Sequence, residues 1–340
     1  MNYAIILSGG IGSRLWPLSS RKEPKQFLNI CSAKSTLEET LRRIGGLIKN
    51  EHIYIATNRL HVKKIKGCTK KSGIPKENFL FEPKGKNTLA PIGVLSHRIS
   101  LLDSDAVVVV LPCDHLIRQR NKFLRLLAKA INVAGDGFIV TLGIRPTRPE
   151  TDYGYIKVKS KIKHQKSKIY KVKKFIEKPR LSKAKRLIKD KGVFWNSGMF
   201  VFKASAILEE IKKYVPDAYN IIKQIRNKQD LKRLWHRFPS ISLDYGVMEK
   251  TKKAALLPAD FGWVDLGSWR AVAEIMKKDK NGNIFKGKCI DIGTKDSFVW
   301  SDKGLVATLG LNNIIIVDTK DSLLVCSKDK AGDVKKLIGS

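Results

Sequence analysis

The chain has 340 residues, 43% of them hydrophobic, and carries a formal net charge of +35. This length and hydrophobic content are enough for a large buried core, and they exclude an intrinsically disordered chain. No apolar run is long enough to cross a bilayer, and the N-terminus enters an apolar segment without the pattern of a secretory signal, so we expect no membrane insertion and no secretion.

The positive charge favours either a nucleic-acid or membrane partner, or a lysine-rich solvated surface. The basic residues are mostly lysine and are spread along the chain, with no arginine-rich segment interleaved with aromatic residues. We therefore expect surface lysines and no nucleic-acid partner. The five cysteines are scattered and form no Cys-x-x-Cys pair, which is typical of a reducing cytoplasm and argues against a disulfide framework or a zinc site.

Apolar runs that read as buried strands alternate with helical patterns in the N-terminal part of the chain. The strand-like runs are 3–7, 53–56, 106–111 and 138–142, and the helical patterns are 37–48, 90–102 and 123–134. This alternation predicts an α/β fold with a mostly parallel, Rossmann-like sheet, whose ligands bind at the carboxyl ends of the strands. The segments after Leu7 and after Leu111 both fall at such ends.

Later segments follow other patterns. Residues 155–159 and 169–176 alternate in polarity, which predicts half-exposed antiparallel strands beside the main sheet. From about residue 283 the helical patterns stop, and short β segments separated by turns follow. We therefore expect a large domain over 1–282 and a small β domain over 283–340.

The segment from Ser8 to Leu28 combines a glycine-rich turn with two cations. Gly9, Gly10 and Gly12 have no Cβ, so backbone N–H groups can approach phosphate oxygens closely. Arg14 adds a planar fork of donors and Lys25 a compact positive charge. Because the segment has neither the Gly-Lys-Ser/Thr ending of a Walker A loop nor the third glycine of a dinucleotide fingerprint, it predicts a different polyphosphate-binding loop.

This segment, with Leu15-Trp16-Pro17-Leu18 and Pro24-Lys25-Gln26-Phe27-Leu28 in register, resembles the signature of sugar-nucleotide pyrophosphorylases, in the mannose-1-phosphate guanylyltransferase branch. The resemblance continues in order through almost the whole chain. It implies a nucleotidyltransferase domain over 1–282 and a small domain like a left-handed β-helix over 283–340. It also implies a Mg²⁺-dependent, cytoplasmic enzyme that converts GTP and mannose 1-phosphate to GDP-mannose and pyrophosphate for polysaccharide biosynthesis.

The resemblance assigns nucleotide and metal ligands. The nucleotide is bound by Gly9, Gly10, Gly12, Ser13, Asn87 and Thr88, with Arg14 and Lys25 as catalytic residues on the phosphates, and Mg²⁺ is bound by Asp114 and Asp265. The residues alone leave simpler structural alternatives open. Asn87 and Thr88 are good caps for the helix after them, and Asp114 and Asp265 are also plausible helix caps.

The resemblance assigns the sugar side as well. Gly154, Glu177 and Asn196 are the sugar-binding residues, and Lys178 is a catalytic residue that neutralises the sugar phosphate. A surface lysine at position 178 is the open alternative there. Residues 243–251 follow the family too, and we assign them support of the site without chemistry.

The chain also departs from the family at several positions. Lys86 stands where arginine is common, Leu89 where alanine is common, and Gly246 in place of alanine. Two other functions stay open: a related nucleotidyltransferase for another base or sugar, and a non-catalytic regulatory homologue that binds a sugar nucleotide. A homodimer is an open alternative to a monomer.

Overall fold

The computed structural model describes residues 1–10, 12–162 and 168–338. Ile11 of the predicted phosphate-binding segment and the last two residues of the predicted β domain lie outside the described residues. The chain forms two compact units, which are described one at a time. The first comprises residues 1–9, 41–113 and 117–263, and the second comprises 10–40, 114–116 and 264 onward. The predicted domain boundary at 282/283 stays a prediction.

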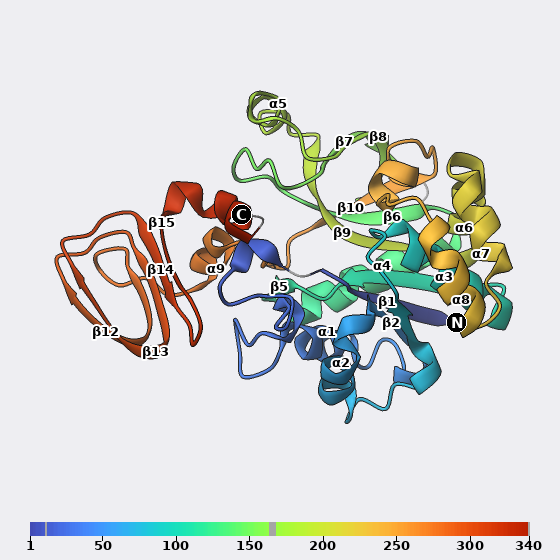
Figure 1. Ribbon diagram of the computed structural model, residues 1–340. Coiled ribbons are helices and arrows are strands. Elements are labelled where there is room, and N and C mark those ends of the chain that lie inside the picture. Colours follow the sequence, from blue (N-terminus) through green and yellow to red (C-terminus); the bar gives the residue numbers. More distant parts are fainter. Residues whose placement is uncertain (11, 163–167, 339–340) are drawn as a thin grey trace. The chain divides into compact units, whose positions relative to one another are not determined.

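The first unit is built on a nine-stranded sheet in the order β3-β2-β1-β4-β9-β6-β10-β8-β7 (Figure 1). Its strands are β1 (Asn2–Ser8), β2 (Ile53–Asn58), β3 (Phe79–Glu82), β4 (Val107–Pro112), β6 (Ile139–Ile144), β7 (Tyr155–Lys161), β8 (Tyr170–Ile176), β9 (Val193–Lys203) and β10 (Ala254–Ala259). β1 pairs in parallel with β2 and β4, as β2 does with β3 and β6 with β10. The predicted α/β sheet is therefore confirmed, although β9 runs antiparallel between β4 and β6 and makes it mixed.

The α-helices of the described residues are α1 (Thr36–Ile44), α2 (Val62–Thr69), α3 (Leu89–Leu102), α4 (Arg120–Gly135), α5 (Leu181–Leu187), α6 (Ala204–Tyr214), α7 (Pro216–Gln224), α8 (Lys228–Leu234) and α9 (Trp269–Ile275). α1 begins with a capping box, in which Glu38 accepts from the Ser35 backbone N–H at 2.9 Å and Ser35 Oγ accepts from the Glu38 N–H at 3.3 Å. The prediction that this helix reaches residue 48 is wrong. It ends before Gly45-Gly46, and Gly46 has φ +88°, the left-handed conformation that commonly terminates helices.

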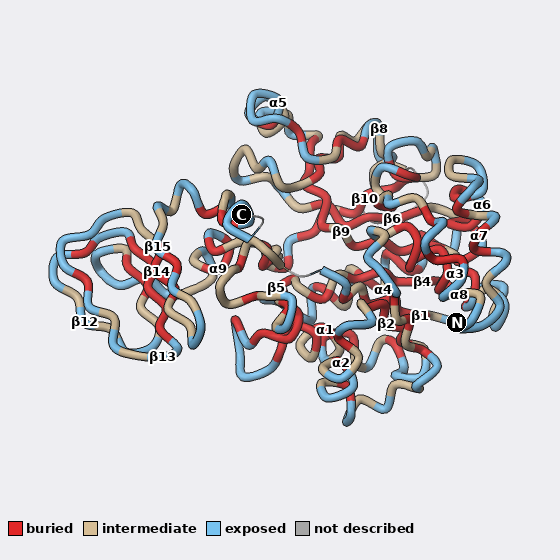
Figure 2. Tube along the Cα trace, viewed as in Figure 1, coloured by how far each residue is buried: buried red, intermediate tan, exposed pale blue. Residues whose placement is uncertain are grey.

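The core of the first unit lies on both faces of the sheet. Alternate residues of the strands, such as Ile5 and Val108, pack with α3, α6 and α7, while α4 packs against β4, β6 and β9. Figure 2 shows the strands as the most buried part of this unit. Because both faces are covered, the central strand β4 is a continuous run of valines rather than an alternating pattern.

The two strands predicted to be antiparallel and half-exposed are β7 and β8. They pair antiparallel at the end of the sheet, and their outer halves are lysine-rich and exposed. The prediction is therefore confirmed.

The carboxyl ends of four strands lie along one edge of this sheet. Ser8 of β1 is in register with Thr57 of β2, Leu7 is in register with Pro112 of β4, and Asn58 is in register with Glu82 of β3. The segments that follow these strands therefore start from the same edge, as the sequence predicts.

The second unit contains a four-stranded sheet of β12 (Ile284–Ile292), β13 (Phe298–Leu309), β14 (Ile314–Asp318) and β15 (Leu323–Ser327). β12, β13 and β14 pair in parallel through short turns, in the manner of a β-helix, and β15 returns antiparallel. Their inward residues, including Phe298 and Trp300, form a core with Leu15, Leu28 and Trp269.

Helical structure does not stop at residue 283, and in this respect the prediction is wrong. Residues Lys328–Ile338 form a 3₁₀ helix, η8, that packs against α9 and η1 (Ser13–Leu15). Ala331 and Val334 are its buried residues, and their spacing of three matches the 3₁₀ repeat. No described helix is both long and apolar enough to cross a membrane.

Candidate active site

The predicted site residues fall into two clusters, one in each compact unit. The phosphate-side cluster of the second unit contains Gly10, Gly12, Ser13, Arg14, Lys25, Asp114 and Asp265. The first unit holds Gly9, Asn87, Thr88, Gly154, Glu177, Lys178 and Asn196.

Lys25 is held in the phosphate-side cluster by a short turn and by a glycine. Pro24 is extended, and residues Lys25–Phe27 then form a 3₁₀ turn, η2, that buries Gln26 and Phe27. Gly12 has φ +81°, and a Cβ on it would lie 2.7 Å from Lys25 Cβ. Gly12 is therefore required both for its left-handed backbone and for the close approach of the lysine stem.

Lys25 and Asp114 form an ion pair through Nζ and Oδ2, and their side chains are 14% and 17% exposed. Burial alone lowers the pKa of the lysine, but the carboxylates of Asp114 and Asp265 outweigh burial and raise it. Burial raises the pKa of Asp114, whereas Lys25 and His115 together lower it by more, so the net pKa is low. Both partners are therefore charged at neutral pH.

Asp265 belongs to the same cluster. It ends β11 (Trp263–Asp265), which pairs with β5 (His115–Ile117), and the Leu266 N–H donates to the Asp114 carbonyl at 3.1 Å. A Cβ on Gly267 would lie 3.1 Å from both carboxylate oxygens of Asp265 and 3.0 Å from an Arg14 guanidinium nitrogen. The bare Gly267 backbone thus lies against an anion and a cation of the predicted site.

The helix-cap alternative for Asp265 is wrong. The N-cap of α9 is Ser268, whose Oγ accepts from the Ala271 N–H at 3.3 Å. Within the described residues, Asp265 Oδ1 is buried and has no hydrogen-bond partner. An unpartnered buried carboxylate oxygen is costly, so it needs a cation or a proton.

The donor set fits a hard divalent cation. The described part of the chain has no group of three or more His, Cys, Asp or Glu side chains that could hold a metal. Two carboxylates are nevertheless enough for Mg²⁺, which usually takes its other ligands from substrate phosphates and water. The residues present therefore fit a metal that binds together with a polyphosphate.

Asn87 and Thr88 of the first unit do not cap the helix that follows them. Thr88 precedes α3 without a side-chain cap, and its Oγ1 accepts from the Leu243 N–H at 2.9 Å. Asn87 has φ +63°, and its Oδ1 accepts from the Thr88 N–H at 2.9 Å. The capping alternative is therefore wrong for both side chains.

Lys86 has a structural use. Its Nζ donates to the carbonyls of His236 at 2.7 Å and Phe238 at 2.6 Å. The indole N–H of Trp235 donates to the Lys84 carbonyl at 2.6 Å from the same region. These contacts fasten the loop before α3, and the lysine charge is directed at protein carbonyls.

Glu82 is a candidate that the sequence analysis did not single out. It ends β3, is 5% exposed, and a Cβ on Gly9 would lie 3.3 Å from its Oε1. Burial raises its pKa to about 7, partly opposed by a hydrogen bond from the Lys86 backbone. An acidic residue at the carboxyl end of a buried strand was the signal that could have identified it.

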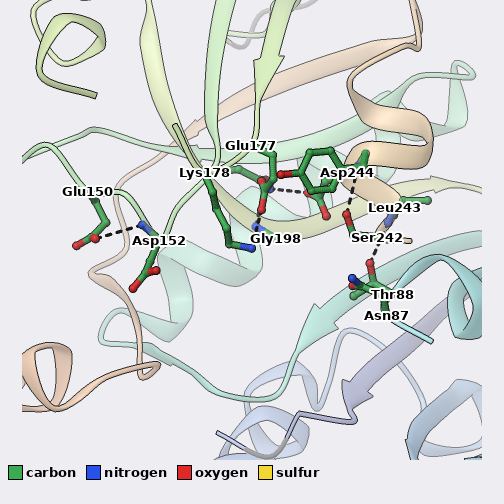
Figure 3. Close-up of polar contacts among 12 residues, drawn as sticks. Asn87, Thr88, Glu150, Asp152, Glu177, Lys178, Gly198, Ser242, Leu243 and Asp244 are labelled. Atoms are coloured by element: carbon green, nitrogen blue, oxygen red, sulfur yellow. Dashed lines mark hydrogen bonds and ion pairs between the residues drawn. The ribbon is translucent and has the colours of Figure 1, made fainter. Parts of the chain in front are cut away.

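The sugar-side cluster, Gly154, Glu177, Lys178, Asn196 and Asp244, is drawn in part in Figure 3. Lys178 Nζ lies 2.8 Å from Glu177 Oε1, and the Glu177 side chain is 8% exposed. The Lys178 side chain is itself 57% exposed, as the surface-lysine alternative expects. Its partial burial lowers its pKa, but Glu177 raises that pKa above the usual value. A Cβ on Gly154 would lie 2.5 Å from Glu177 Oε2, so glycine at 154 makes room for this carboxylate.

Asn196 makes its hydrogen bonds to protein groups. Its Nδ2 donates to Asp244 Oδ1 at 2.9 Å, and its Oδ1 accepts from the Gly198 N–H at 3.1 Å and Thr141 Oγ1 at 3.2 Å. Asp244 begins a π-helical turn, η7 (Asp244–Met248), that the sequence pattern did not indicate. Burial, and then the neighbouring Glu177, raise the pKa of Asp244 to about 7.

The loop before β7 is organised around Glu150. Its Oε1 accepts from the Asp152 N–H at 3.3 Å, which Figure 3 draws, and from the Thr151 N–H at 3.0 Å. Its Oε2 lies 3.1 Å from Arg148 Nε. The Tyr155 hydroxyl donates to the Glu150 carbonyl at 2.8 Å. This loop is thus ordered by its own side chains.

Comparison with known proteins gives matches to both parts of the chain. A family model described as nucleotidyl transferase matches residues 3–282, and one described as a MannoseP isomerase/GMP-like beta-helix domain matches residues 287–340. The mannose-1-phosphate guanylyltransferase of Salmonella muenchen is 38% identical over 348 residues, which cover 98% of this chain and 72% of that protein. The alginate biosynthesis protein AlgA of Pseudomonas aeruginosa is 34% identical over 350 residues, which cover 98% and 71%.

A solved structure is similar over the full length. The crystal structure described as mannose-1-phosphate geranyltransferase from Thermus thermophilus superimposes with a TM-score of 0.89. It is 32% identical in sequence, and the match covers 99% of this chain and 98% of that one.

Proposed function

This chain belongs to the mannose-1-phosphate guanylyltransferase family of nucleotidyl transferases, and from that premise we propose that it joins GTP and mannose 1-phosphate to give GDP-mannose and pyrophosphate. The observation that carries the proposal is the charged phosphate-side cluster. A largely buried lysine, an arginine and two carboxylates meet there beside glycines that would crowd them if they had side chains. Such a cluster suits a polyphosphate and its metal.

Arg14 and Lys25 are the proposed ligands of the triphosphate and of the departing pyrophosphate. Arg14 offers planar donors to two phosphate oxygens at once, and Lys25 a compact charge. Gly9, Gly10, Gly12 and Ser13 are proposed to bring backbone N–H groups to the same phosphates.

Asp114 and Asp265 are the proposed holders of Mg²⁺. The unpartnered buried oxygen of Asp265 supports this assignment, because that carboxylate needs a positive charge. Asp114 lies in the same cluster, where its ion pair with Lys25 keeps it ionised and able to bind a cation. When bound, Mg²⁺ supplies charge neutralisation on the reacting phosphates.

Glu82, Asn87 and Thr88 are the proposed base and ribose side of the nucleotide. Guanine presents an N1–H and an amino group on one edge, and a carboxylate accepts both, whereas adenine lacks that pair of donors. The buried Glu82 carboxyl beside Gly9 supports its role in reading this edge. Asn87, in its left-handed conformation, is the proposed ligand of the ribose.

Gly154, Glu177, Asn196 and Lys178 are the proposed sugar side. Glu177 accepts from hexose hydroxyls, and the Lys178 ammonium neutralises the sugar phosphate. The oxygen of that phosphate attacks the α-phosphorus of GTP in line. Because the nucleophile is already ionised, no general base is required, and catalysis consists of positioning and charge neutralisation.

We also infer a cytoplasmic enzyme that supplies GDP-mannose for polysaccharide synthesis. The scattered cysteines support the location, and the AlgA relative, named for alginate biosynthesis, supports the pathway class. A homodimer and a domain boundary at 282/283 are further proposals. Light scattering of the purified protein tests the homodimer, and separate expression of residues 1–282 tests the boundary.

The decisive experiment incubates the purified chain with Mg²⁺, mannose 1-phosphate and each nucleoside triphosphate in turn, and measures pyrophosphate. We expect GTP with mannose 1-phosphate to give the highest kcat/KM. A higher value with another base, or with glucose 1-phosphate, would transfer the assignment to a related nucleotidyltransferase. Tight binding of GDP-mannose without turnover of any pair would indicate the non-catalytic homologue.

A further inference from the structure

We propose that Asp244 contacts a hexose hydroxyl directly, beside Glu177, and that Asn196 is a positioning residue that acts through Asp244. The inference rests on the proposed function, and it adds a sugar-binding residue from a segment to which the sequence assigned only structural support. It also restricts the sugar-side role of Asn196 to positioning, because both of its amide atoms bind protein groups. Three independent features of the sugar-side cluster carry it.

The first feature is the fixed orientation of Asn196. An asparagine amide has one acceptor oxygen and one donor nitrogen. Here the oxygen accepts from Gly198 and Thr141, so the nitrogen is the atom that faces Asp244 Oδ1 at 2.9 Å. Asn196 is 9% exposed, whereas Asp244 is half-buried and is followed by the exposed Tyr245. Of the two side chains, the carboxyl is therefore the better placed to meet a ligand.

The second feature is the charge balance of the cluster. Two carboxyls, Glu177 and Asp244, share one ammonium, that of Lys178, which pairs with Glu177 Oε1 at 2.8 Å. Burial and the Glu177 charge raise the pKa of Asp244 to about 7, with Lys178 and Asn196 opposing. Asp244 is therefore largely protonated below neutral pH, while Glu177 is paired with the ammonium.

This pairing matches the chemistry of a sugar. A neutral carboxylic acid donates one hydrogen bond, and a carboxylate only accepts. A hexose hydroxyl both donates and accepts, so it can donate to Glu177 and accept from Asp244. Glu249 and Tyr245 are the other titratable groups near the pair: Glu249 Oε1 accepts from the Glu177 N–H at 3.2 Å, and Tyr245 is 45% exposed.

The third feature is the backbone that holds Asp244. π-Helical turns are rare and occur often at functional sites. This turn is fixed by a hydrogen bond from the Leu243 N–H to Thr88 Oγ1 at 2.9 Å and by one from the Gly246 N–H to the Ser242 carbonyl at 2.9 Å (Figure 3 draws the first). The turn that bears the Asp244 carboxyl is therefore anchored to the loop before α3, which fixes the position of the carboxyl for contact with a ligand.

The test measures kcat and both KM values for the full chain and for Asp244→Ala, Asp244→Asn and Asn196→Ala. Asp244→Ala should raise the KM for mannose 1-phosphate about tenfold or more, with the KM for GTP within about twofold of wild type. Asp244→Asn should raise it only about threefold, because an amide keeps the acceptor for Asn196 and a donor for the sugar. Asn196→Ala should raise it in the wild-type background and have no further effect on Asp244→Ala, as expected of a residue that acts through Asp244.

The pH profile provides a second readout. As Asp244 loses its proton above about pH 7, the wild-type KM for mannose 1-phosphate should rise relative to that of Asp244→Asn. Ionisation of the sugar phosphate affects both proteins equally and cancels in this ratio. If Asp244→Ala does not fold, the comparison of wild type with Asp244→Asn decides alone. A ratio of their KM values for mannose 1-phosphate that rises with pH supports the contact, and a ratio that stays constant contradicts it.

The inference is overturned if Asp244→Ala leaves the KM for mannose 1-phosphate unchanged, raises both KM values equally, or if the wild-type to Asp244→Asn ratio does not vary with pH. These results leave the proposed function intact, since the wild-type chain still makes GDP-mannose. Absence of GDP-mannose synthesis by the wild-type chain instead removes the proposed function, and the inference with it.

Discussion

The Leu89 side chain fills the space that a side chain at position 246 would need. Leu89, the fully buried first residue of α3, lies where a Cβ on Gly246 would be 2.5 Å from its Cδ1. The family resemblance identifies alanine as the common residue at both positions. In this chain one position has gained volume and the other has lost it, across a single contact between α3 and the π-helical turn of Asp244.

We expect Gly246→Ala to destabilise the protein by ~1–3 kcal/mol, because the added methyl group overpacks against Leu89. Alanine would by itself stabilise a helical position by only ~0.5–1 kcal/mol relative to glycine, so the steric cost dominates. Urea unfolding, followed by tryptophan fluorescence, measures the change.

The double variant Leu89→Ala/Gly246→Ala is the control. Leu89→Ala alone should cost ~2–5 kcal/mol through the cavity that it leaves. If the two residues compensate each other, the double variant is more stable than the sum of the single effects predicts, with a coupling of ~0.5–3 kcal/mol. Additive effects would show that the two departures are unrelated.

The sequence predicted the elements of the sheet because their signals are local. Valine runs such as that of β4 and alternating patterns such as that of β7 depend only on neighbouring residues and on how many faces are covered. The C-terminal 3₁₀ helix was missed because its two buried residues gain their burial from η1 and α9, which are distant in sequence.

The residues of the candidate site could be predicted where they lie within a recognisable sequence motif. Lys25, Asp114 and Asp265 were found this way, although they come together from distant segments. The hydrogen bonding of Asn196 could not be predicted from the sequence, because its partners Thr141 and Asp244 are 55 and 48 residues away. Likewise, sequence could not tell that the Lys86 ammonium binds carbonyls 150 and 152 residues away rather than a substrate.

We expect Glu82→Gln to weaken GTP binding and base discrimination. A carboxylate that accepts from both donors of the guanine edge contributes ~1.5–3 kcal/mol per hydrogen bond, so the KM for GTP should rise by roughly tenfold or more and the preference over ATP should fall. Steady-state kinetics with both nucleotides measures this. The exposed Glu77→Gln, just before β3, is the matched control and should change neither value.

The proposed role of Glu82 also predicts the direction in which the KM for GTP changes with pH. Its pKa of about 7 means that acid protonates the carboxyl and removes an acceptor. The wild-type KM for GTP should therefore rise as pH falls through 7, and the KM of Glu82→Gln should not follow. Parallel profiles for the two proteins would remove Glu82 from the base site.

The net charge of +35 is expected to reflect solvated lysines and no nucleic-acid site. In a gel-shift assay at physiological salt we expect only weak binding without sequence preference, which disappears steeply with added salt because it depends on counterion release. Tight binding that competes with GTP turnover would show a second function.

The most demanding prediction concerns Asp265. Ser268 already caps α9, so Asp265 has no capping role to lose, and Asp265→Asn is nearly isosteric. The variant should keep its melting temperature. Its turnover should fall about a hundredfold, or ~3 kcal/mol in the activation free energy, because one anionic ligand of the metal is gone. High Mg²⁺ or Mn²⁺ should restore part of the rate.

Ser268→Ala is the matched control, three residues away on the same segment. Loss of the cap should cost ~1 kcal/mol of stability and lower the melting temperature, while turnover stays close to wild type. The two variants therefore separate stability from catalysis in opposite directions. If Asp265→Asn turned over GTP and mannose 1-phosphate at nearly the wild-type rate, Asp265 would be withdrawn from the metal site, and Asp114 would be left as the one proposed protein carboxylate on the metal.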